Sequence, residues 1–565
     1  MFLFEYKKIE NYIIRIIFSI QQMFSTFTKR IFVSSPYLGN CFRKSFSDYA
    51  KKALIQNGIQ NEHAKVYLNL DYDELRQHEI QNQEGQVLNN GVFTIDTGEF
   101  TGRSPKDKYF VDNDPSNKYI DWGKVNQKMS TTTFDDLEQQ VKEYYNKLDK
   151  IYVFDGYAAY GDNETTKKIR FITHYAFQHH FVKNMFYSLP KDLAEKDTKE
   201  PDFTVINASN LKNQKWKEQG LNSENFVGIH LEKKLGLIGG TSYTGENKKL
   251  IFTLYNYWMP LKRKLSLHCG ASVNHKNESI LFLGLSGTGK TSLSTIDGVK
   301  IIGDDEHIYY DKKVVNLENG NYAKCAKLSK ENEPVIYQAI RENALLENIW
   351  VENGNPNYDN ISKTENSRVS YPITNVPERI EGGVYGNVKR IVFLTCDAYS
   401  VLPRLSILNS KQAIDYFLMG YTSKLAGTER GIKEPVPTFS PCFGAAFMVH
   451  HPKVYARLLK EEIEKNDLKV YLLNTGWHGG PDHLGGKRVD MKITLKLVRS
   501  IYDGDIDDAP TIQLDELDGL QVPTRVRDLD EETLIPWNSW RDQNQYKEEC
   551  QKLMTKFRDE IKKYE

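Results

Sequence analysis

The residues with the clearest chemical potential lie between Gly284 and Thr291, where two glycines frame four residues and a Lys–Thr pair follows. Glycines let successive backbone N–H groups curve around a phosphate, Lys290 can reach the outer phosphates of a nucleotide, and the Thr291 hydroxyl suits Mg²⁺. The apolar run 280–283 predicts a buried strand before this loop, and residues 291–294 can begin a helix. The segment therefore predicts a nucleotide phosphate site, with a chance glycine-rich turn as the alternative.

Carboxylates end the next apolar run. Residues 300–303 predict a short strand that leads directly into Asp304 and Asp305. A strand that ends in carboxylates beside a phosphate loop can hold Mg²⁺ or Mn²⁺ near a triphosphate. Asp304 follows Lys290 by only 14 positions (304 − 290), which leaves no room for the helix and crossover of a GTPase or motor-type fold. A solvated acidic turn is the plainer alternative.

Length and composition limit the class of protein. A chain of 565 residues predicts two or more lobes, and 39% hydrophobic with 12% aromatic residues is enough for large cores. Lys+Arg and Asp+Glu are equal at 75 each, which argues against a general nucleic-acid binder. The six cysteines are scattered without a C-x-x-C pair, a pattern that favours a reducing compartment over a disulfide scaffold or zinc ribbon.

The N-terminus differs in composition from the rest of the chain. Residues 11–47 contain no Asp or Glu, five Lys and Arg, and several serines. This composition is typical of a mitochondrial presequence, and a disordered N-terminal extension is an equally weighted alternative. No apolar run is long enough to predict a transmembrane helix.

Hydrophobic periodicity predicts the helices and strands that must position the candidate site residues. A surface helix is expected at 135–145, and the tail from 531 to 565 has a charged helical pattern. Strands are expected at 151–154 and 388–395. Residues 258–261 are expected at a hinge or edge between two lobes. The fold class is therefore α/β with two lobes, and the cleft between them is the default substrate site.

Several polar clusters have ordinary explanations when each is taken singly. An arginine in a turn is usually solvated, a histidine among apolar neighbours is usually a satisfied core residue, and a lysine pair on a loop is usually surface charge. The clusters are Gly102–Lys108, Gly239–Lys249, Leu267–Cys269, Asn366–Ser370 and Gly485–Arg488.

Together with the phosphate loop, these clusters resemble the family of ATP-dependent phosphoenolpyruvate carboxykinases from about residue 89 to about residue 500. The loop resembles that of the ATP-using rather than the GTP-using relatives. The resemblance implies an N-terminal lobe at 48–264 that binds oxaloacetate or phosphoenolpyruvate and a C-terminal P-loop lobe at 265–565 that binds ATP and metal, after an extension at 1–47. The matching segments are 100–107, 217–226, 284–291, 303–307, 323–330, 426–431 and 474–477.

The resemblance also implies a reaction. The family converts oxaloacetate and ATP to phosphoenolpyruvate, ADP and CO₂, and uses Mn²⁺ and Mg²⁺. It implies small-molecule partners, no nucleic acid or membrane, and the option of a homo-oligomer. The resemblance implies the cytosol, which is the usual compartment of the family. The basic, acid-free N-terminus instead favours the mitochondrial matrix, and the two are equally weighted. Loss of CO₂ leaves an enolate, which a metal ion and fixed cations stabilise before it attacks the γ-phosphoryl group.

Residue roles follow from the resemblance by position. Arg103 is implied to hold the substrate carboxylate, with Tyr243, Lys249 and Arg368 lining the same pocket, and the catalytic set adds Lys290 and Lys324. The implied Mn²⁺ ligands are Lys249, His268 and Asp305, and the implied Mg²⁺ residues are Thr291 and Asp304. The implied nucleotide contacts are Gly284, Ser286, Gly287, Thr288, Gly289, Lys290, Thr291, Glu333, Arg368, Arg488 and Thr494.

Two segments depart from the family pattern. The loop 478–486 is longer than in shorter bacterial forms and precedes Arg488, and residues 270–274 differ from the family after the implied ligand His268. A catalytically inactive, nucleotide-binding relative with a regulatory role is the alternative function, and the completeness of the polar set argues against it. A P-loop kinase that phosphorylates proteins would leave Arg103 and the upstream lobe unexplained.

Overall fold

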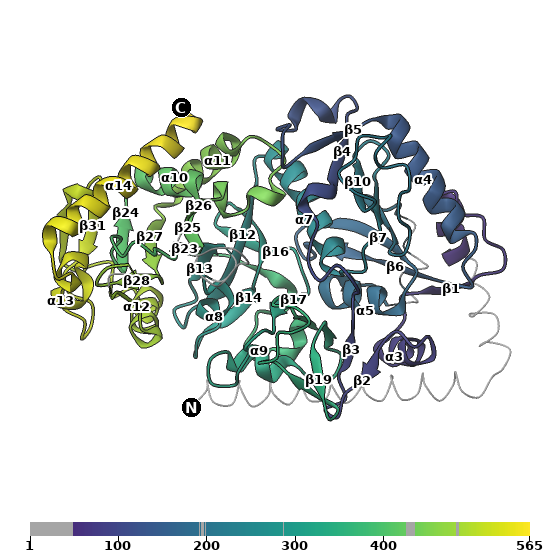
Figure 1. Cartoon of the computed structure of the whole chain (residues 1–565), viewed down its shortest axis with the longest axis horizontal. Helices are drawn as coiled ribbons and strands as arrows, with labels where there is room; N and C mark the ends of the chain where they lie inside the picture. The colour runs from purple at the N-terminus through teal and green to yellow at the C-terminus, as the bar shows by residue number, and fades with distance from the viewer. Residues whose placement is uncertain are drawn as a thin grey trace, which may run out of the picture.

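The computed structural model describes residues 49–565 except 191–192, 194–196, 198, 286–287, 425–435 and 482–484. The proposed presequence, Ser286, Gly287, the matching segment 426–431, Cys41 and part of the 478–486 loop lie outside the described residues. The described fold is a mixed α/β structure with two large sheets and one smaller sheet that shares strands from distant parts of the chain (Figure 1).

The first large sheet has nine strands in the order β1-β6-β7-β9-β11-β10-β4-β5, with β8 paired to β6. Helix α4 packs on one face, and α5 and α7 pack on the other. In strand β6, Ile151 and Val153 therefore enter the core on the α4 side and Phe154 enters the core on the other side, which explains the apolar run at 151–154. Its strands are β1 (Lys65–Leu68), β4 (Lys108–Val111), β5 (Gln127–Met129), β6 (Lys150–Ala158), β7 (Lys167–Thr173), β8 (Tyr187–Ser188), β9 (Phe203–Ala208), β10 (Phe226–His230) and β11 (Leu235–Gly239).

The second large sheet has eleven strands in the order β22-β16-β15-β12-β13-β23-β27-β24-β31-β30, with β14 paired to β12. The strands expected at 280–283, 300–303 and 388–395 are confirmed as β13, β14 and β23. Its strands are β12 (Leu265–Val273), β13 (Ser279–Gly284), β14 (Lys300–Gly303), β15 (Glu306–Tyr310), β16 (Lys313–Asn316), β22 (Val384–Tyr385), β23 (Val388–Thr395), β24 (Leu405–Leu408), β27 (Lys469–Asn474), β30 (Thr511–Leu514) and β31 (Leu520–Pro523).

A five-stranded sheet joins residues that are more than two hundred positions apart in the sequence. Its order is β17-β21-β18-β3-β2, and β3 runs parallel to β18. Only β18 separates β3, which precedes the basic turn at 102–108, from β21, which carries Arg368. The strands are β2 (Gln86–Val87), β3 (Phe93–Ile95), β17 (Gly320–Lys324), β18 (Leu345–Glu347) and β21 (Arg368–Pro372).

The helices confirm the expected helix at 135–145 and the helical tail. Short strand pairs β19–β20 (Trp350–Glu352, Asn355–Asn357), β25–β26 (Tyr421–Lys424, Val436–Phe439) and β28–β29 (Trp477–His478, Lys487–Arg488) lie outside the larger sheets. The helices are α3 (Tyr72–Gln81), α4 (Thr131–Tyr145), α5 (Ala176–Met185), α7 (Gly245–Leu261), α8 (Lys290–Ser294), α9 (Pro334–Ala339), α10 (Ser410–Met419), α11 (Pro452–Asn466), α12 (Met491–Asp503), α13 (Glu531–Leu534) and α14 (Gln543–Ile561).

Residues 258–261, expected at a hinge or edge between lobes, form the last turn of α7. Pro260 has no N–H to donate to the carbonyl of Asn256 one turn earlier. The Tyr455 hydroxyl donates to that carbonyl instead, at 2.7 Å. The helix can therefore continue through the proline, and the connection from α7 to β12 is confined to residues 262–264.

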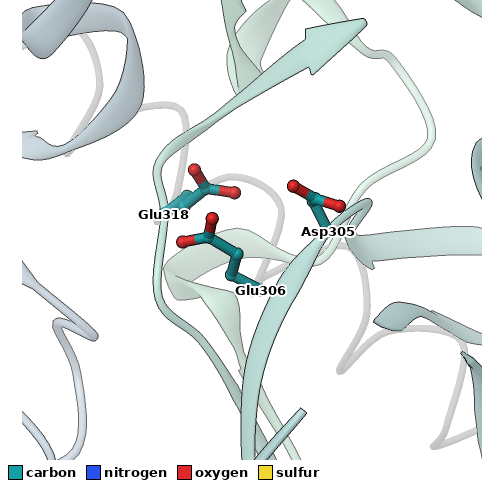
Figure 2. A group of neighbouring side chains, drawn as sticks. All are labelled: Asp305, Glu306 and Glu318. Carbon is teal, nitrogen blue, oxygen red and sulfur yellow. The ribbon is translucent and has the colours of Figure 1, made fainter. Parts of the chain in front are cut away.

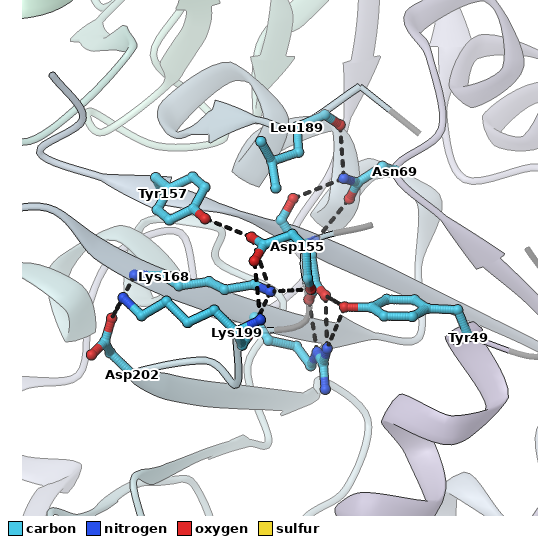
Figure 3. A network of polar contacts seen from close by, with 10 residues as sticks. Tyr49, Asn69, Asp155, Tyr157, Lys168, Leu189, Lys199 and Asp202 are labelled. Atoms are coloured by element: carbon cyan, nitrogen blue, oxygen red, sulfur yellow. Dashed lines mark hydrogen bonds and ion pairs between the residues drawn. The ribbon is translucent and has the colours of Figure 1, made fainter. Parts of the chain in front are cut away.

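A buried polar network anchors the first described residues to the nine-stranded sheet (Figure 3). The Tyr49 hydroxyl donates to Oδ2 of Asp155 at 2.8 Å. Arg170 donates from Nε and Nη2 to the two oxygens of the same carboxylate, at 2.7 Å each. Asn69 donates to the main-chain carbonyls of Asp155 and Leu189, so three distant segments meet at one aspartate.

Two further expectations concern the described residues as a whole. The five cysteines within the described ranges have free, buried thiols. Among the same residues, none of the helices combines the length and the apolar character needed to cross a membrane.

Candidate functional site

The phosphate-loop segment connects the end of β13 to the start of α8, as the sequence predicts. A side chain at Gly284 would place its Cβ 2.4 Å from Oγ1 of Thr288, and Gly289 has a left-handed φ of +96°, so both positions favour glycine. The Lys290 ammonium is buried and donates to the Gly284 carbonyl at 2.7 Å. Burial lowers the pKa of Lys290 to about 8. Thr291 follows it in the first turn of α8.

His268, Lys249 and Asp305 converge from three different elements. Nε2 of His268 on β12 lies 2.9 Å from Oδ1 of Asp305. Nζ of Lys249 on α7 lies 2.7 Å from Oδ2 of the same carboxylate. Asp305 sits between β14 and β15. The structure thus brings together the three residues for which the resemblance implies a metal.

The surroundings of His268 fit a cation at this point. Its Nδ1 lies 2.9 Å from the Phe443 carbonyl, which can only accept, so Nδ1 carries the proton. Burial, followed by the Lys290 charge, lowers the pKa of His268 to about 4. A neutral ring with its proton on Nδ1 directs the Nε2 lone pair at Asp305. A metal ion is the partner that suits a facing nitrogen lone pair and carboxylate.

Asp305 also belongs to a cluster of three carboxylates. Single carboxylate oxygens of Asp305, Glu306 and Glu318 all lie within 4.8 Å of one another, and Figure 2 shows the three side chains close together. The Lys248 ammonium lies 3.0 Å from Asp305 and 2.9 Å from Glu318. The Lys249 ammonium lies 2.8 Å from Glu306. Because two lysines already face these carboxylates, the His268 side of Asp305 fits a metal better.

Sequence reasoning missed Lys248, Glu306 and Glu318. Burial lowers the pKa of Lys248, but the Asp305 and Glu318 charges outweigh it and hold that pKa well above its ordinary value. Burial and the Glu306 charge raise the pKa of Glu318 well above the ordinary range. A signal was present: Lys248 and Glu306 stand next to apolar runs on α7 and β15.

Asp304 presents a buried oxygen without a protein partner. Its Oδ1 has no hydrogen bond within the described part of the chain, and burial raises the pKa of this carboxyl to about 6. Buried polar atoms without partners are rare in folded proteins. The orphaned oxygen therefore fits a second cation near the phosphate loop, in agreement with the role that the resemblance implies.

The two implied substrate arginines are linked through Asn366, which sequence reasoning also missed. Its amide oxygen accepts Nε–H and Nη2–H of Arg368 at 3.0 and 2.8 Å. Its amide nitrogen donates to the Thr101 carbonyl at 2.7 Å, two residues before Arg103. Arg103 itself lies over the Phe447 ring, 4.4 Å from the centroid.

Tyr322 on β17 organises the remaining substrate-side residues. The Arg368 guanidinium lies 5.5 Å from its ring centroid, and the Tyr243 ring lies 6.2 Å away. Lys324 and Arg368 are directly opposed on the antiparallel strands β17 and β21, and burial followed by the Arg368 charge lowers the pKa of Lys324. Two cations are thus held side by side, an arrangement that suits a polyanion.

The residues implied to contact the nucleotide divide into two groups. Glu333 accepts from the Ser292 hydroxyl of α8 at 3.0 Å, which ties it to the phosphate loop. Arg488 is exposed on β29, 6.0 Å from the Trp477 ring centroid. Thr494 is buried in α12, where its hydroxyl donates to the Asp490 carbonyl at 3.4 Å. Within the described ranges, the contacts of Arg488 and Thr494 do not join them to the phosphate-loop residues.

The arrangement has a definite chemical capacity. A guanidinium can hold a carboxylate, and a metal with fixed cations can stabilise negative charge that develops beside a carbonyl. A lysine in a phosphate loop and paired cations opposite it can neutralise a phosphoryl group in transfer.

Comparison with known proteins gives one consistent result. The family model for phosphoenolpyruvate carboxykinase matches residues 64–532. A Campylobacter lari protein named phosphoenolpyruvate carboxykinase (ATP) is 48% identical over 91% of this chain and 97% of its own. Relatives with the same name from Sulfurimonas denitrificans and Leptospira biflexa are 48% and 46% identical over 90% and 91% of this chain, and 95% and 96% of their own.

Proposed function

The chain belongs to the family of ATP-dependent phosphoenolpyruvate carboxykinases, and we propose that the cluster around Asp305, Arg103 and Lys290 is its active site. It is an enzyme, a carboxy-lyase that converts oxaloacetate and ATP to phosphoenolpyruvate, ADP and CO₂, a reaction of gluconeogenesis. The length of the alignments supports this function, because the relatives match along about nine-tenths of the chain.

The observation that carries the active-site proposal is the convergence of Lys249 and His268 on the two oxygens of Asp305. These three residues would hold a divalent ion, which would supply a Lewis acid that stabilises enolate charge. Lys249 also lies 4.6 Å from the Phe447 ring centroid, on the same ring as Arg103. This shared ring supports a common role of Arg103 and the proposed metal ligands on one small substrate.

In the proposed decarboxylation half of the reaction, Arg103 holds one carboxylate of oxaloacetate and Tyr243 lines the pocket. A planar guanidinium can bind a carboxylate through two parallel hydrogen bonds, which fixes the angle of the substrate. Arg368, oriented by Asn366, adds positive charge opposite the developing enolate. As the C–C bond breaks, its electron pair moves onto the enolate oxygen and neutral CO₂ leaves, so the total charge is unchanged but one negative charge shifts to that oxygen. Fixed cations close to that oxygen therefore favour the enolate.

In the proposed phosphoryl half, Gly284, Ser286, Gly287, Thr288 and Gly289 surround the phosphates of ATP. Lys290 neutralises them, while Lys324 and Arg368 meet the γ-phosphoryl group from β17 and β21. Glu333 orients α8 through Ser292. Thr291 and Asp304 would hold Mg²⁺, and Lys249, His268 and Asp305 would hold Mn²⁺. Arg488 and Thr494 are assigned to the adenine side.

The division into lobes is part of the proposal. Residues 48–264 form the substrate lobe and residues 265–565 the P-loop lobe, with the reactants between them. The extension at 1–47 serves as a mitochondrial presequence or as a plain extension of a cytosolic enzyme. A fusion of this segment to a fluorescent reporter distinguishes the two, because only the first directs the reporter to mitochondria. The enzyme can also assemble as a homo-oligomer, which sedimentation measures.

One assay tests the whole proposal. Oxaloacetate-dependent formation of phosphoenolpyruvate is followed with ATP and then with GTP. The proposal predicts that Arg103→Ala lowers turnover with ATP by about a hundredfold or more, because it removes a fixed substrate contact. Nucleotide binding without turnover would instead support the inactive regulatory relative.

A further inference from the structure

Two charged side chains, Lys108 and Glu246, are buried close to Arg103. They are 9% and 7% exposed. Among the described residues neither has an ion-pair partner, and Lys108 donates to the neutral amide oxygen of Asn126 at 3.4 Å. Each instead binds a backbone group. Burial of a charged group without an ion-pair partner is costly, so the two residues need an explanation beyond stability.

Glu246 holds the main chain at Arg103. Its Oε1 accepts the N–H of Ser104 at 2.7 Å, the amide directly after Arg103. Glu246 and Lys249 lie three positions apart in the first turns of α7 and therefore share one helix face. The other side of the turn is held by Asn366 through the Thr101 carbonyl. The backbone that presents Arg103 is thus fixed before and after that residue.

Lys108 holds the ring on which Arg103 rests. Its Nζ donates to the Ala446 carbonyl at 2.8 Å, the group directly before Phe447. In the described part of the chain, the Arg103 guanidinium forms no hydrogen bond or ion pair with protein, and its close partner is the Phe447 face. The ring therefore sets the plane of the guanidinium while its N–H groups stay available.

The three charges also influence one another. Burial, followed by the Arg103 charge, lowers the pKa of Lys108 to about 7. Burial raises the pKa of Glu246, and the Arg103 charge opposes that rise. A small cavity is lined by Arg103, Ser104, Lys108, Glu246, Lys249 and Phe447, so the group borders open space beside a proposed metal ligand.

We propose that Lys108 and Glu246 are positioning residues that fix the angle and depth of the Arg103 guanidinium for a substrate carboxylate. Glu246 acts through the Ser104 amide, and Lys108 acts through Phe447. The inference rests on the proposed role of Arg103 in the active site. Neither residue touches substrate in this account, and removal of either leaves the guanidinium present but misdirected.

The test measures binding of phosphoenolpyruvate without ADP or CO₂, so that no turnover is needed. Titration calorimetry with Mn²⁺ present compares Glu246→Ala and Lys108→Met with the wild type. Each variant is expected to weaken phosphoenolpyruvate binding by about tenfold or more and to leave ATP binding within about twofold, because a misplacement near 1 Å has effects of this order. Glu246→Gln keeps the acceptor oxygen and is expected to restore most of the affinity.

A matched control uses the same type of bond elsewhere. Glu232 accepts the Ser116 N–H at 3.0 Å, away from Arg103, so Glu232→Ala should leave both affinities unchanged. The decisive comparison repeats Glu246→Ala in an Arg103→Ala background, where its effect on phosphoenolpyruvate should disappear because the residue acts through Arg103.

The outcomes separate this inference from the proposed function. If Arg103→Ala weakens phosphoenolpyruvate binding but Glu246→Ala and Lys108→Met do not, the positioning inference is overturned and the active site stands. An equal loss of ATP and phosphoenolpyruvate affinity assigns the residues a structural role and also overturns it. If Arg103→Ala itself has no effect, the role of Arg103 fails and the inference fails with it. Should Glu246→Ala not fold, Lys108→Met decides: a raised KM for oxaloacetate with an unchanged KM for ATP supports the inference, and an unchanged KM for oxaloacetate overturns it.

Discussion

Nε2 of His268 lies 2.9 Å from Oδ1 of Asp305, although Nδ1 of the same ring already faces a main-chain carbonyl. A protonated ring could satisfy both neighbours, but burial keeps the ring neutral near pH 7 by lowering its pKa to about 4. This relationship supports the cation site proposed at these two side chains. The adjacent Lys249 can add a third ligand only as a neutral amine, since an ammonium has no lone pair.

Lys249→Arg is expected to abolish most metal binding and oxaloacetate decarboxylation while ATP binding stays largely intact. Arginine keeps the positive charge beside Asp305 but remains protonated, so it cannot act as a ligand. Mn²⁺ affinity, measured by electron paramagnetic resonance, tests this directly, and in the wild type it should rise with pH as protons leave the ligands. Undiminished Mn²⁺ affinity in the variant would return Lys249 to the role of a carboxylate-binding cation.

Lys290→Ala is expected to lower turnover by about a hundredfold or more, because it removes a charge-assisted phosphate contact. The wild type is expected to prefer ATP strongly over GTP in kcat/KM. Steady-state kinetics with both nucleotides measure the two effects together. Lys300→Ala is a suitable control, because Lys300 is exposed at the start of β14. Equal or higher kcat/KM with GTP would contradict the nucleotide assignment.

Glu84→Gln is expected to be more stable than the wild type at pH 8.5. At pH 5 this advantage in unfolding free energy should be smaller. Burial raises the pKa of Glu84 to about 7, although Asn82 and the N–H groups of Ala176 and Phe177 donate to it. A raised folded-state pKa means that this stability is present below the unfolded value of 4.5 and lost as pH rises through about 7.

Denaturant unfolding at several pH values measures this effect. The difference in free energy of unfolding between Glu84→Gln and wild type should grow by about 3 kcal/mol in favour of the variant across that range, at about 1.4 kcal/mol per pKa unit. A difference that does not change with pH would show that Glu84 stays ionised, held by the N-terminal amides of α5.

Leu54→Ala is expected to cost about 3 kcal/mol of unfolding free energy, whereas Ile55→Ala should change it by less than about 0.5 kcal/mol. Leu54 is 2% exposed in the core that α4 shares with the nine-stranded sheet, and the neighbouring Ile55 is 62% exposed. Thermal and denaturant unfolding measure both. A chain that begins at Tyr49 should keep full activity and stability, and equal effects of the two substitutions would contradict the packing described for this segment.

Local sequence predicted several parts of the fold correctly. The apolar runs 280–283, 300–303 and 388–395 became strands in one sheet, because strand formation follows from short-range hydrophobic pattern and flanking turns. The glycines and Lys290 indicated a phosphate site for the same local reason. The resemblance, rather than periodicity, supplied Lys249, His268 and Asp305 as a set.

The sequence by itself determined which residue types are available: a phosphate loop, carboxylates at the end of a strand, and scattered arginines, lysines and histidines. Only the tertiary structure decided which of them meet. Lys248 with Glu318, and Asn366 with Arg368 and Thr101, form contacts that depend on how the sheets close. Burial then decides their chemistry, because a charge that looks like solvated surface in the sequence changes its pKa and its partners once water is removed.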